Sequence, residues 1–107
     1  MATCQNFRIT VKNSCHGEIK VKKFEYKDGS NWKTETGMLG PDGSKKIEKD
    51  HDFTWTRDLG GISNEDTQFR VTYSHHVGGT TWGSEISAVT GTFRAQANES
   101  RTVTLTQ

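Results

Sequence analysis

The sequence predicts an all-β fold, a single antiparallel β-sandwich of about seven to nine strands that spans residues 1–107 and is immunoglobulin-like in build. Apolar and polar residues alternate over several short runs, and clusters of Gly, Asn, Asp and Ser separate these runs at intervals of about ten to fifteen residues. No window of about eleven residues carries an apolar stripe at helical spacing. A small Greek-key barrel shares this local pattern and is the alternative.

The clearest strands lie near the N-terminus. Apolar residues occupy every second position over 7–11 and again over 19–21, as expected of strands with one buried face. The parity then slips, because Lys23 stands where an apolar residue is due and Phe24 and Tyr26 follow one position late. A β-bulge in one long strand explains this slip.

The remaining strands are predicted from shorter runs. The alternation is again regular over 69–74. Further strands are expected at 44–49, at 52–57, within 81–90, at 91–95 and at 101–107. Turns are expected between them, at 13–17, 27–31, 40–44, 59–66, 77–81 and 96–100.

The alternation also predicts the core. Trp55 alternates with Phe53, so it is expected to be the core tryptophan between the two sheets. The full set of side chains expected inside is Phe7, Ile9, Val11, Ile19, Val21, Trp55, Phe69, Val71, Tyr73, Phe93, Val103 and Leu105.

The amino-acid composition limits the classes of function that can be expected. Hydrophobic residues make up only 30% of the chain, but the alternation concentrates them on strand faces, which argues against disorder. The net charge of +1 gives no global attraction to nucleic acid or to anionic membranes. The run KVKKFEYK at 20–27 would suit single-stranded nucleic acid only if Phe24 and Tyr26 faced outward. We expect both in the core, with lysines on the other face, so nucleic acid is not a predicted partner.

The two cysteines are expected to be free thiols. The strand between Cys4 and Cys15 holds its ends about 20 Å apart, whereas a disulfide needs a Cα separation below about 7 Å. Cys15 and His16 are neighbours, as in a thiol nucleophile beside its base. Consecutive side chains in a tight turn diverge, so we expect no catalytic pair here.

No metal and no cofactor is predicted. His75 and His76 are adjacent in a strand and therefore point to opposite faces. Asp50 and Asp52 flank His51 at strand spacing and are expected to share a face. If the protein does bind a metal, calcium at these carboxylates is therefore favoured over zinc at the histidines.

The sequence also contains no recognisable catalytic or targeting motif. The sequence contains no GxSxG, HExxH, Walker A or GxGxxG motif, so the protein is expected not to be an enzyme. The start MATCQNF has no secretory pattern, and no apolar run approaches the roughly 20 residues of a membrane span. A cytoplasmic location, or export without a classical signal peptide, is expected.

The tryptophans give the candidate binding site. Trp32 and Trp82 each follow a polar, turn-like stretch, where an indole is expected to be half exposed and able to stack on a sugar ring. We expect the loops 28–35 and 75–85 to form one rim. Its predicted ligand-binding residues are Trp82, Trp32, His76, Asn31, Glu35 and Glu85.

A small β-sandwich with loop tryptophans and no leader resembles the aegerolysin-type and actinoporin-like membrane-binding proteins and several leaderless lectins. The resemblance lies in architecture and composition, not in an aligned motif. It favours a non-catalytic ligand-binding module, lectin-like, with carbohydrate as its partner and a homo-oligomer as the source of avidity. The alternatives are a membrane-binding or pore-forming protein that meets lipid, and a scaffold for protein–protein interaction.

Overall fold

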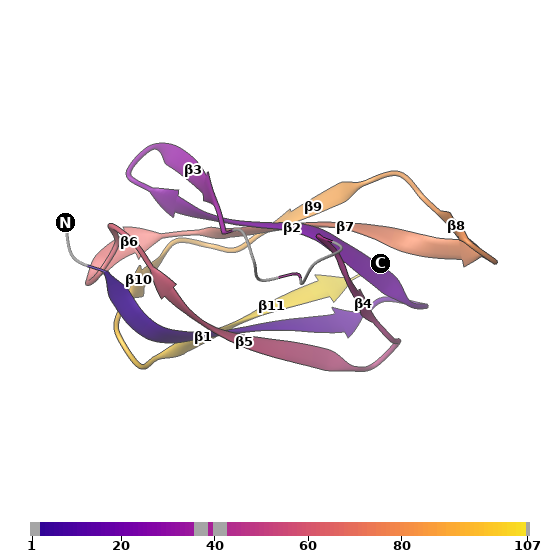
Figure 1. Ribbon diagram of the computed structural model, residues 1–107, viewed down its shortest axis with the longest axis horizontal. Helices are drawn as coiled ribbons and strands as arrows, with labels where there is room; N and C mark the ends of the chain where they lie inside the picture. Colours follow the sequence, from indigo (N-terminus) through magenta and orange to yellow (C-terminus); the bar gives the residue numbers. More distant parts are fainter. Residues whose placement is uncertain (1–2, 36–38, 40–42, 107) are drawn as a thin grey trace.

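The computed structural model describes residues 3–35, 39 and 43–106, and these residues form strands and turns only. Figure 1 shows the strands in two layers, with β2, β7 and β9 above and β1, β5 and β11 below. The all-β prediction is confirmed. The strands are β1 Cys4–Ser14, β2 Ile19–Asp28, β3 Asn31–Thr34, β4 Lys45–Ile47, β5 Asp52–Leu59, β6 Glu65–Thr67, β7 Phe69–Gly78, β8 Thr81–Trp82, β9 Ile86–Val89, β10 Phe93–Ala95 and β11 Ser100–Thr106.

One layer is a three-stranded sheet in the order β11-β1-β5. β1 runs antiparallel to β5 and parallel to β11, with Val11 opposite Val103 in the parallel pair. This pair corrects the prediction of a wholly antiparallel sandwich. A period of two is the same in parallel and antiparallel strands, so the alternation carries no information about strand direction.

The other layer is a six-stranded antiparallel sheet. Its main path is β3-β2-β7-β8, and β4 pairs with β2 while β9 pairs with β7. The register between β2 and β7 shifts between Val21 and Lys23, so Lys22 is the additional residue and the predicted bulge is confirmed. A small pair of β10 and β6 completes the described strands, and none of the described sheets closes into a barrel.

Two segments expected to be loops contain strands. Residues 31–34 form β3 and pair with β2, and residues 65–67 form β6 and pair with β10. Both strands consist largely of polar residues, so they show no apolar alternation, and their partners impose the extended conformation. Of the turn expected at 40–44, residues 40–42 lie outside the described part of the chain.

The core lies between the layers. Phe69 is its centre, because the rings of Phe24, Phe93 and Phe7 lie 4.8, 4.9 and 5.7 Å from its own ring. All three contacts have edge-on geometry, in which the positive ring edge meets the negative ring face. Ten of the twelve predicted core residues are buried: Phe7, Ile9, Val11, Ile19, Val21, Phe69, Val71, Tyr73, Val103 and Leu105.

Trp55 and Phe93 were expected inside and are only partly buried. Trp55 faces the core from β5, but β5 is an edge strand in its sheet, so one side of the ring stays open. Its neighbour Phe53 is 38% exposed for the same reason. Phe93 packs against Phe69, and the guanidinium of Arg101 lies 4.4 Å from its ring centroid.

Candidate functional site

The structure divides the six predicted ligand-binding residues between two places. Asn31, Trp32 and Glu35 belong to the β2–β3 hairpin and its end, while His76, Trp82 and Glu85 belong to the β7–β8 hairpin and the segment after it. These hairpins lie at opposite ends of the six-stranded sheet (Figure 1). The single rim expected from the sequence is therefore not formed.

The pairing register gives the separation. Trp32 pairs with Lys27, whereas Trp82 pairs with His76, one step beyond the pair of Ile19 and His75. About eight rows of the sheet, or roughly 25 Å, lie between the two indoles. The molecule is long enough for this, with principal extents of 45 × 23 × 22 Å.

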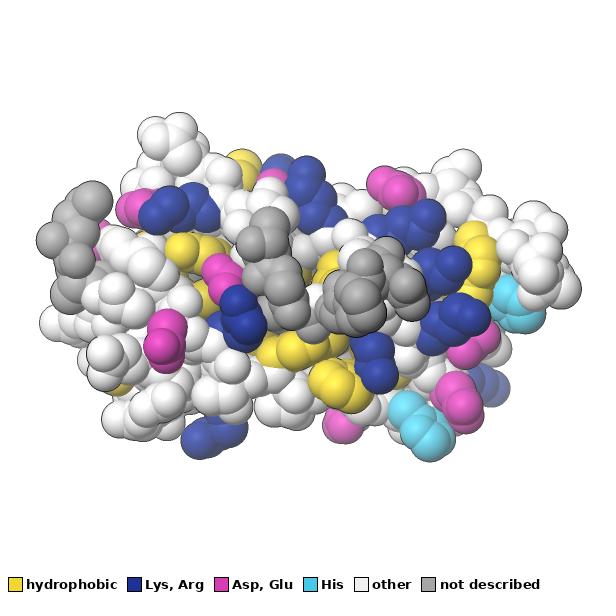
Figure 2. All heavy atoms as spheres, in the orientation of Figure 1, with side chains coloured by type: hydrophobic (Ala, Val, Ile, Leu, Met, Phe, Trp, Pro, Cys, Tyr) yellow, Lys and Arg dark blue, Asp and Glu magenta, His cyan; other side chains and the backbone are white. Residues whose placement is uncertain are grey.

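Both tryptophans lie on the outer face of this sheet. Phe24 and Tyr26 point from β2 into the core, as expected, so the residues that alternate with them face outward. We call this surface the lysine face, part of which is visible along the upper and right side of Figure 2. Its cations are Lys20, Lys22, Lys23 and Lys27 of β2, Lys46 of β4 and Arg70 of β7.

Trp82 sits among three basic side chains. The ammonium groups of Lys20 and Lys46 lie 4.4 and 5.9 Å from the centroid of its ring, and the ring of His76 lies at 4.9 Å. His76 Nε2 donates a hydrogen bond of 2.8 Å to the carbonyl of Gly79, which orients the imidazole across the hairpin. The result is a half-buried indole bordered by cationic and imidazole nitrogens.

Two further polar groups belong to this end. Glu85 forms an ion pair of 3.7 Å with Lys22. Ser74 stands opposite Lys20 in the register, on the same outer face, and is fully buried. Its hydroxyl has no hydrogen-bond partner among the described residues.

Trp32 has different neighbours from those of Trp82. The Arg70 guanidinium lies 4.3 Å from its ring centroid and the Lys27 ammonium lies at 5.5 Å. Arg70 also donates two hydrogen bonds of 2.8 Å to the carboxylate of Glu25, which is 5% exposed. These bonds hold the pKa of Glu25 below its usual range, against the opposing effect of burial. Arg70 is therefore neutralised by a fixed partner beneath the indole.

The other two predicted ligand-binding residues of this hairpin, Glu35 and Asn31, do not lie on the same surface as the Trp32 indole. Glu35 accepts hydrogen bonds of 3.0 and 2.8 Å from Arg57 of β5, toward the other layer. Asn31 precedes Trp32 in a strand and so points to the opposite face. Sequence reasoning missed the cations that do contact the indoles. The alternation of Phe24 and Tyr26 could have indicated these cations, because it places the lysines of β2 together on the outer surface.

The cysteines are free thiols, as predicted. Burial raises the pKa of Cys15, and its thiol donates a hydrogen bond of 3.4 Å to the carbonyl of Leu105. Burial also raises the pKa of Cys4, with a further contribution from the negative charges of Glu99 and Asp58. Neither thiol has the lowered pKa or the exposure of a nucleophile.

The histidines and the paired aspartates do not converge on one point. His75 contacts Tyr73 inside the sandwich while His76 contacts Trp82 outside it. Asp50 lies in a turn with a φ of 66° and not in a strand, so the strand spacing that was expected to place it on the same face as Asp52 is not formed. Within residues 3–35, 39 and 43–106, no three His, Cys, Asp or Glu side chains are placed to hold a metal ion.

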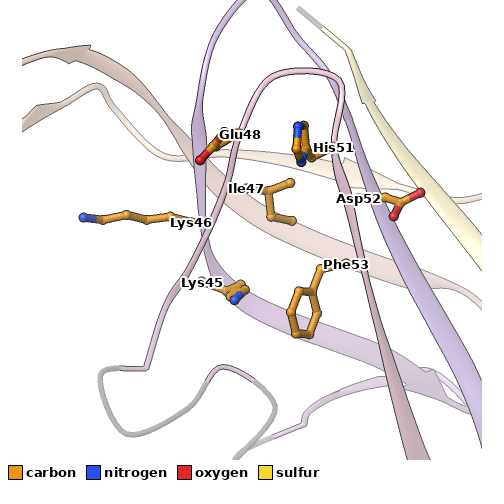
Figure 3. A pocket seen from close by; sticks show the side chains of 7 residues that line it. All are labelled: Lys45, Lys46, Ile47, Glu48, His51, Asp52 and Phe53. Carbon is orange, nitrogen blue, oxygen red and sulfur yellow. The ribbon is translucent and has the colours of Figure 1, made fainter.

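Two shallow hollows open on other parts of the surface. One, of about 180 Å³, lies between the edge strands β4 and β5 and is floored by Ile47 and Phe53, with the Lys45 ammonium 4.1 Å from the Phe53 ring centroid. Figure 3 shows the carboxylates of Glu48 and Asp52 pointing to opposite sides of it. The other, of about 370 Å³, is lined by Asn6, Thr56, Arg57 and Asp58. Neither brings two carboxylates together as general acid and base.

Comparisons with models of known families, with curated proteins and with solved structures found no match. The part of the chain that the structure describes contains no helix long and apolar enough to cross a bilayer.

Proposed function

We propose that this chain is an immunoglobulin-like β-sandwich that works as a non-catalytic, lectin-like carbohydrate-binding module, with its sugar site at Trp82. The observation that carries the proposal is the half-buried Trp82 ring with Lys20, Lys46 and His76 around it. An aromatic face that accepts the apolar face of a pyranose ring, beside groups that bind its hydroxyls, is the usual composition of a small polar-ligand site.

The chemistry of each group suits a sugar. The two ammonium groups donate hydrogen bonds, the His76 ring donates or accepts them, and the Glu85 carboxylate accepts them. Gly78 ends β7 and Gly79 begins the turn to β8, and no heavy atom lies within 4 Å of the point that a Cβ would occupy at either position. Such contacts are individually weak, and a single site should bind with about 4–8 kcal/mol, with avidity from a homo-oligomer.

The proposal narrows the predicted residue set. His76 pairs with Trp82 at one end of the sheet and Glu85, three residues further along the chain, pairs with Lys22, whereas Trp32 lies roughly 25 Å away. The ring of Trp32 also lies over Arg70, which two hydrogen bonds fix to Glu25. We therefore assign Trp32 a packing role outside the sugar site.

A glycan array probed with a multimerised sample tests the proposal. Trp82→Ala should abolish retention, because it removes the stacking surface, while Trp32→Ala is the matched control and should retain the same glycans. Thermal unfolding of both variants establishes that each is folded. Retention of no glycan, or equal retention by the Trp82→Ala variant, would refute the proposal.

Membrane docking is a second candidate, and one observation favours it. Val77 is 67% exposed in the same β7–β8 hairpin as Trp82, whose ring lies 4.4 Å from the Lys20 ammonium and 5.9 Å from the Lys46 ammonium. An apolar tip with an indole and flanking cations is typical of an interfacial contact. Vesicles should then shift tryptophan emission to shorter wavelength, and Val77→Asp should remove the shift. Unchanged emission with both neutral and anionic vesicles would exclude this function.

A further inference from the structure

We infer that the carbohydrate is an acidic polysaccharide that runs along the lysine face from Trp82 toward Trp32. This inference rests on the proposed function and names its ligand class. The chain as a whole carries a net charge of only +1, yet six of its cations lie on this one surface. The positive charge is thus concentrated where both indoles lie.

Three of the six cations on the lysine face have no carboxylate partner among the described residues. Lys20, Lys27 and Lys46 have their ammonium groups over indole rings, at 4.4, 5.5 and 5.9 Å. A cation–π contact holds an ammonium group in place without cancelling its charge. The other three cations pair with carboxylates: Arg70 is bound to the buried Glu25, Lys23 lies 3.7 Å from the same carboxylate, and Lys22 pairs with Glu85 at 3.7 Å.

The opposite surface of the sandwich has a different character. Threonines line the outer side of the three-stranded sheet, where Thr54, Thr102 and Thr104 are exposed and the hydroxyls of Thr10 and Thr54 are 2.8 Å apart. Lys12 of this sheet pairs with Asp52 in the register. The contrast makes the lysine face the surface suited to a polyanion, and Lys12 a control on the other side.

The spacing of the aromatic residues favours a polysaccharide over single-stranded nucleic acid. A nucleic-acid platform stacks successive bases on exposed aromatic rings. Here the aromatic residues of β2, Phe24 and Tyr26, are buried, and roughly 25 Å separates Trp32 from Trp82. A chain whose charge lies on substituents of a sugar backbone needs no ladder of stacked rings.

The length of the lysine face distinguishes an acidic polysaccharide from a membrane as its ligand. Docking through Val77 would place Lys20 and Lys46 near the lipid headgroups, because both contact Trp82. Lys27 contacts Trp32 at the far end of the sheet, well beyond the screening length of about 8 Å at physiological salt. Lys27 should therefore matter for a long polyanion and not for a bilayer met by the hairpin.

Binding of a sulfated polysaccharide and of the same polymer after desulfation, measured by titration at several salt concentrations, tests the inference. The variant Lys23→Gln/Lys27→Gln changes two cations that do not contact Trp82. Its matched control is Lys12→Gln/Lys49→Gln, which removes the same charge from exposed positions elsewhere. Thermal unfolding of both variants accompanies the titrations.

The sulfated polymer should bind more tightly than the desulfated one. Lys23→Gln/Lys27→Gln should weaken its binding about tenfold at low salt and reduce the slope of log affinity against log salt by about two, while the control changes neither. Equal binding of both polymers overturns the inference and leaves the proposed sugar site standing. Tighter binding of single-stranded DNA or of anionic vesicles overturns it as well. If Lys23→Gln/Lys27→Gln weakens binding of the sulfated polymer but Trp82→Ala does not, the polyanion surface is supported and the sugar site at Trp82 is refuted.

Discussion

Trp32 and Trp82 project from the same face of one sheet, yet about eight rows of paired residues lie between them. Each indole therefore contacts its own cations, Arg70 and Lys27 at one end and Lys20 and Lys46 at the other. Substitutions at the two ends should act independently, since sites this far apart with no shared partner are additive.

Glu25→Gln should make the stability of the protein less dependent on pH in the acid range. Arg70 lowers the pKa of Glu25 in the folded protein, whereas a Glu in an unfolded chain titrates near pH 4.3. A lowered folded-state pKa contributes stability that is complete above the unfolded-state value. It is lost as the pH falls from about 4.3 through the lowered pKa.

Urea unfolding at a series of pH values measures this effect. The wild type should lose stability more steeply than Glu25→Gln below about pH 4.3, and the variant should be the less stable of the two at neutral pH. Glu65→Gln is the control, because Glu65 is exposed. Parallel curves for wild type and Glu25→Gln would contradict the prediction.

Gly61→Ala should be strongly destabilising. Gly61 has a φ of +83°, and a Cβ atom at this position would lie 2.8 Å from Oδ2 of Asp28, whose carboxylate pairs with Lys33 at 3.1 Å. The substitution combines left-handed backbone strain with displacement of this ion pair, and we expect a loss of more than about 2 kcal/mol in the free energy of unfolding.

Gly29→Ala separates the two causes. Gly29 has a φ of +64°, but no heavy atom lies within 4 Å of the point that an alanine Cβ would occupy, so only backbone strain applies. Its cost should be about 1–2 kcal/mol. Equal losses in urea unfolding of the two variants would show that the Asp28 contact contributes nothing.

Asn13→Ala should cost about 2–4 kcal/mol. Asn13 is fully buried, and its amide nitrogen donates hydrogen bonds of 2.9 Å to the carbonyls of Gly17 and Ile47, while its side-chain oxygen accepts one from the Cys15 amide. Truncation leaves three backbone groups without partners. Ser74→Ala is the contrast, because the Ser74 hydroxyl makes no hydrogen bond to any residue that the structure describes, and urea unfolding should find it neutral or stabilising.

Local patterns predicted much of the fold. The parity slip at Lys23 predicted the bulge of β2, and alternation predicted the burial of Phe69 and Val71. Alternation reports which face is buried but not which strands are neighbours. The parallel pairing of β1 with β11 and the edge position of β5, which leaves Trp55 partly exposed, depend on pairings between residues far apart in the sequence.

The candidate site was less predictable for the same reason. Trp32 and Trp82 were correctly expected to be half exposed, since each follows a polar turn. Their separation follows from the β2–β7 register, which no local pattern encodes. The contact of Lys46 with Trp82 likewise requires β4 to pair with β2, and β4 is only three residues long.

Cys4 and Cys15 should react with a thiol reagent only when the protein unfolds. Both side chains are buried, and burial raises the pKa of each thiol, so the thiolate fraction is small in the folded state. Labelling followed by mass spectrometry should show two labels in denaturant without reductant and slow labelling in native buffer. A mass lower by the two hydrogens lost on forming a bridge would contradict it.

Trp32→Ala and Trp82→Ala should have opposite signatures. Removal of Trp32 uncovers Arg70 and the Glu25 carboxylate beneath it, so solvent weakens that pair and the acid-dependent loss of stability becomes shallower, as it does in Glu25→Gln. Removal of Trp82 leaves this pair untouched but takes away the surface on which Lys20 rests. Glycan retention should then fail while the acid limb of the unfolding curve keeps the wild-type slope. Loss of glycan retention in Trp32→Ala, or a changed acid limb in Trp82→Ala, would show that the two ends are coupled, against the separation that the register imposes.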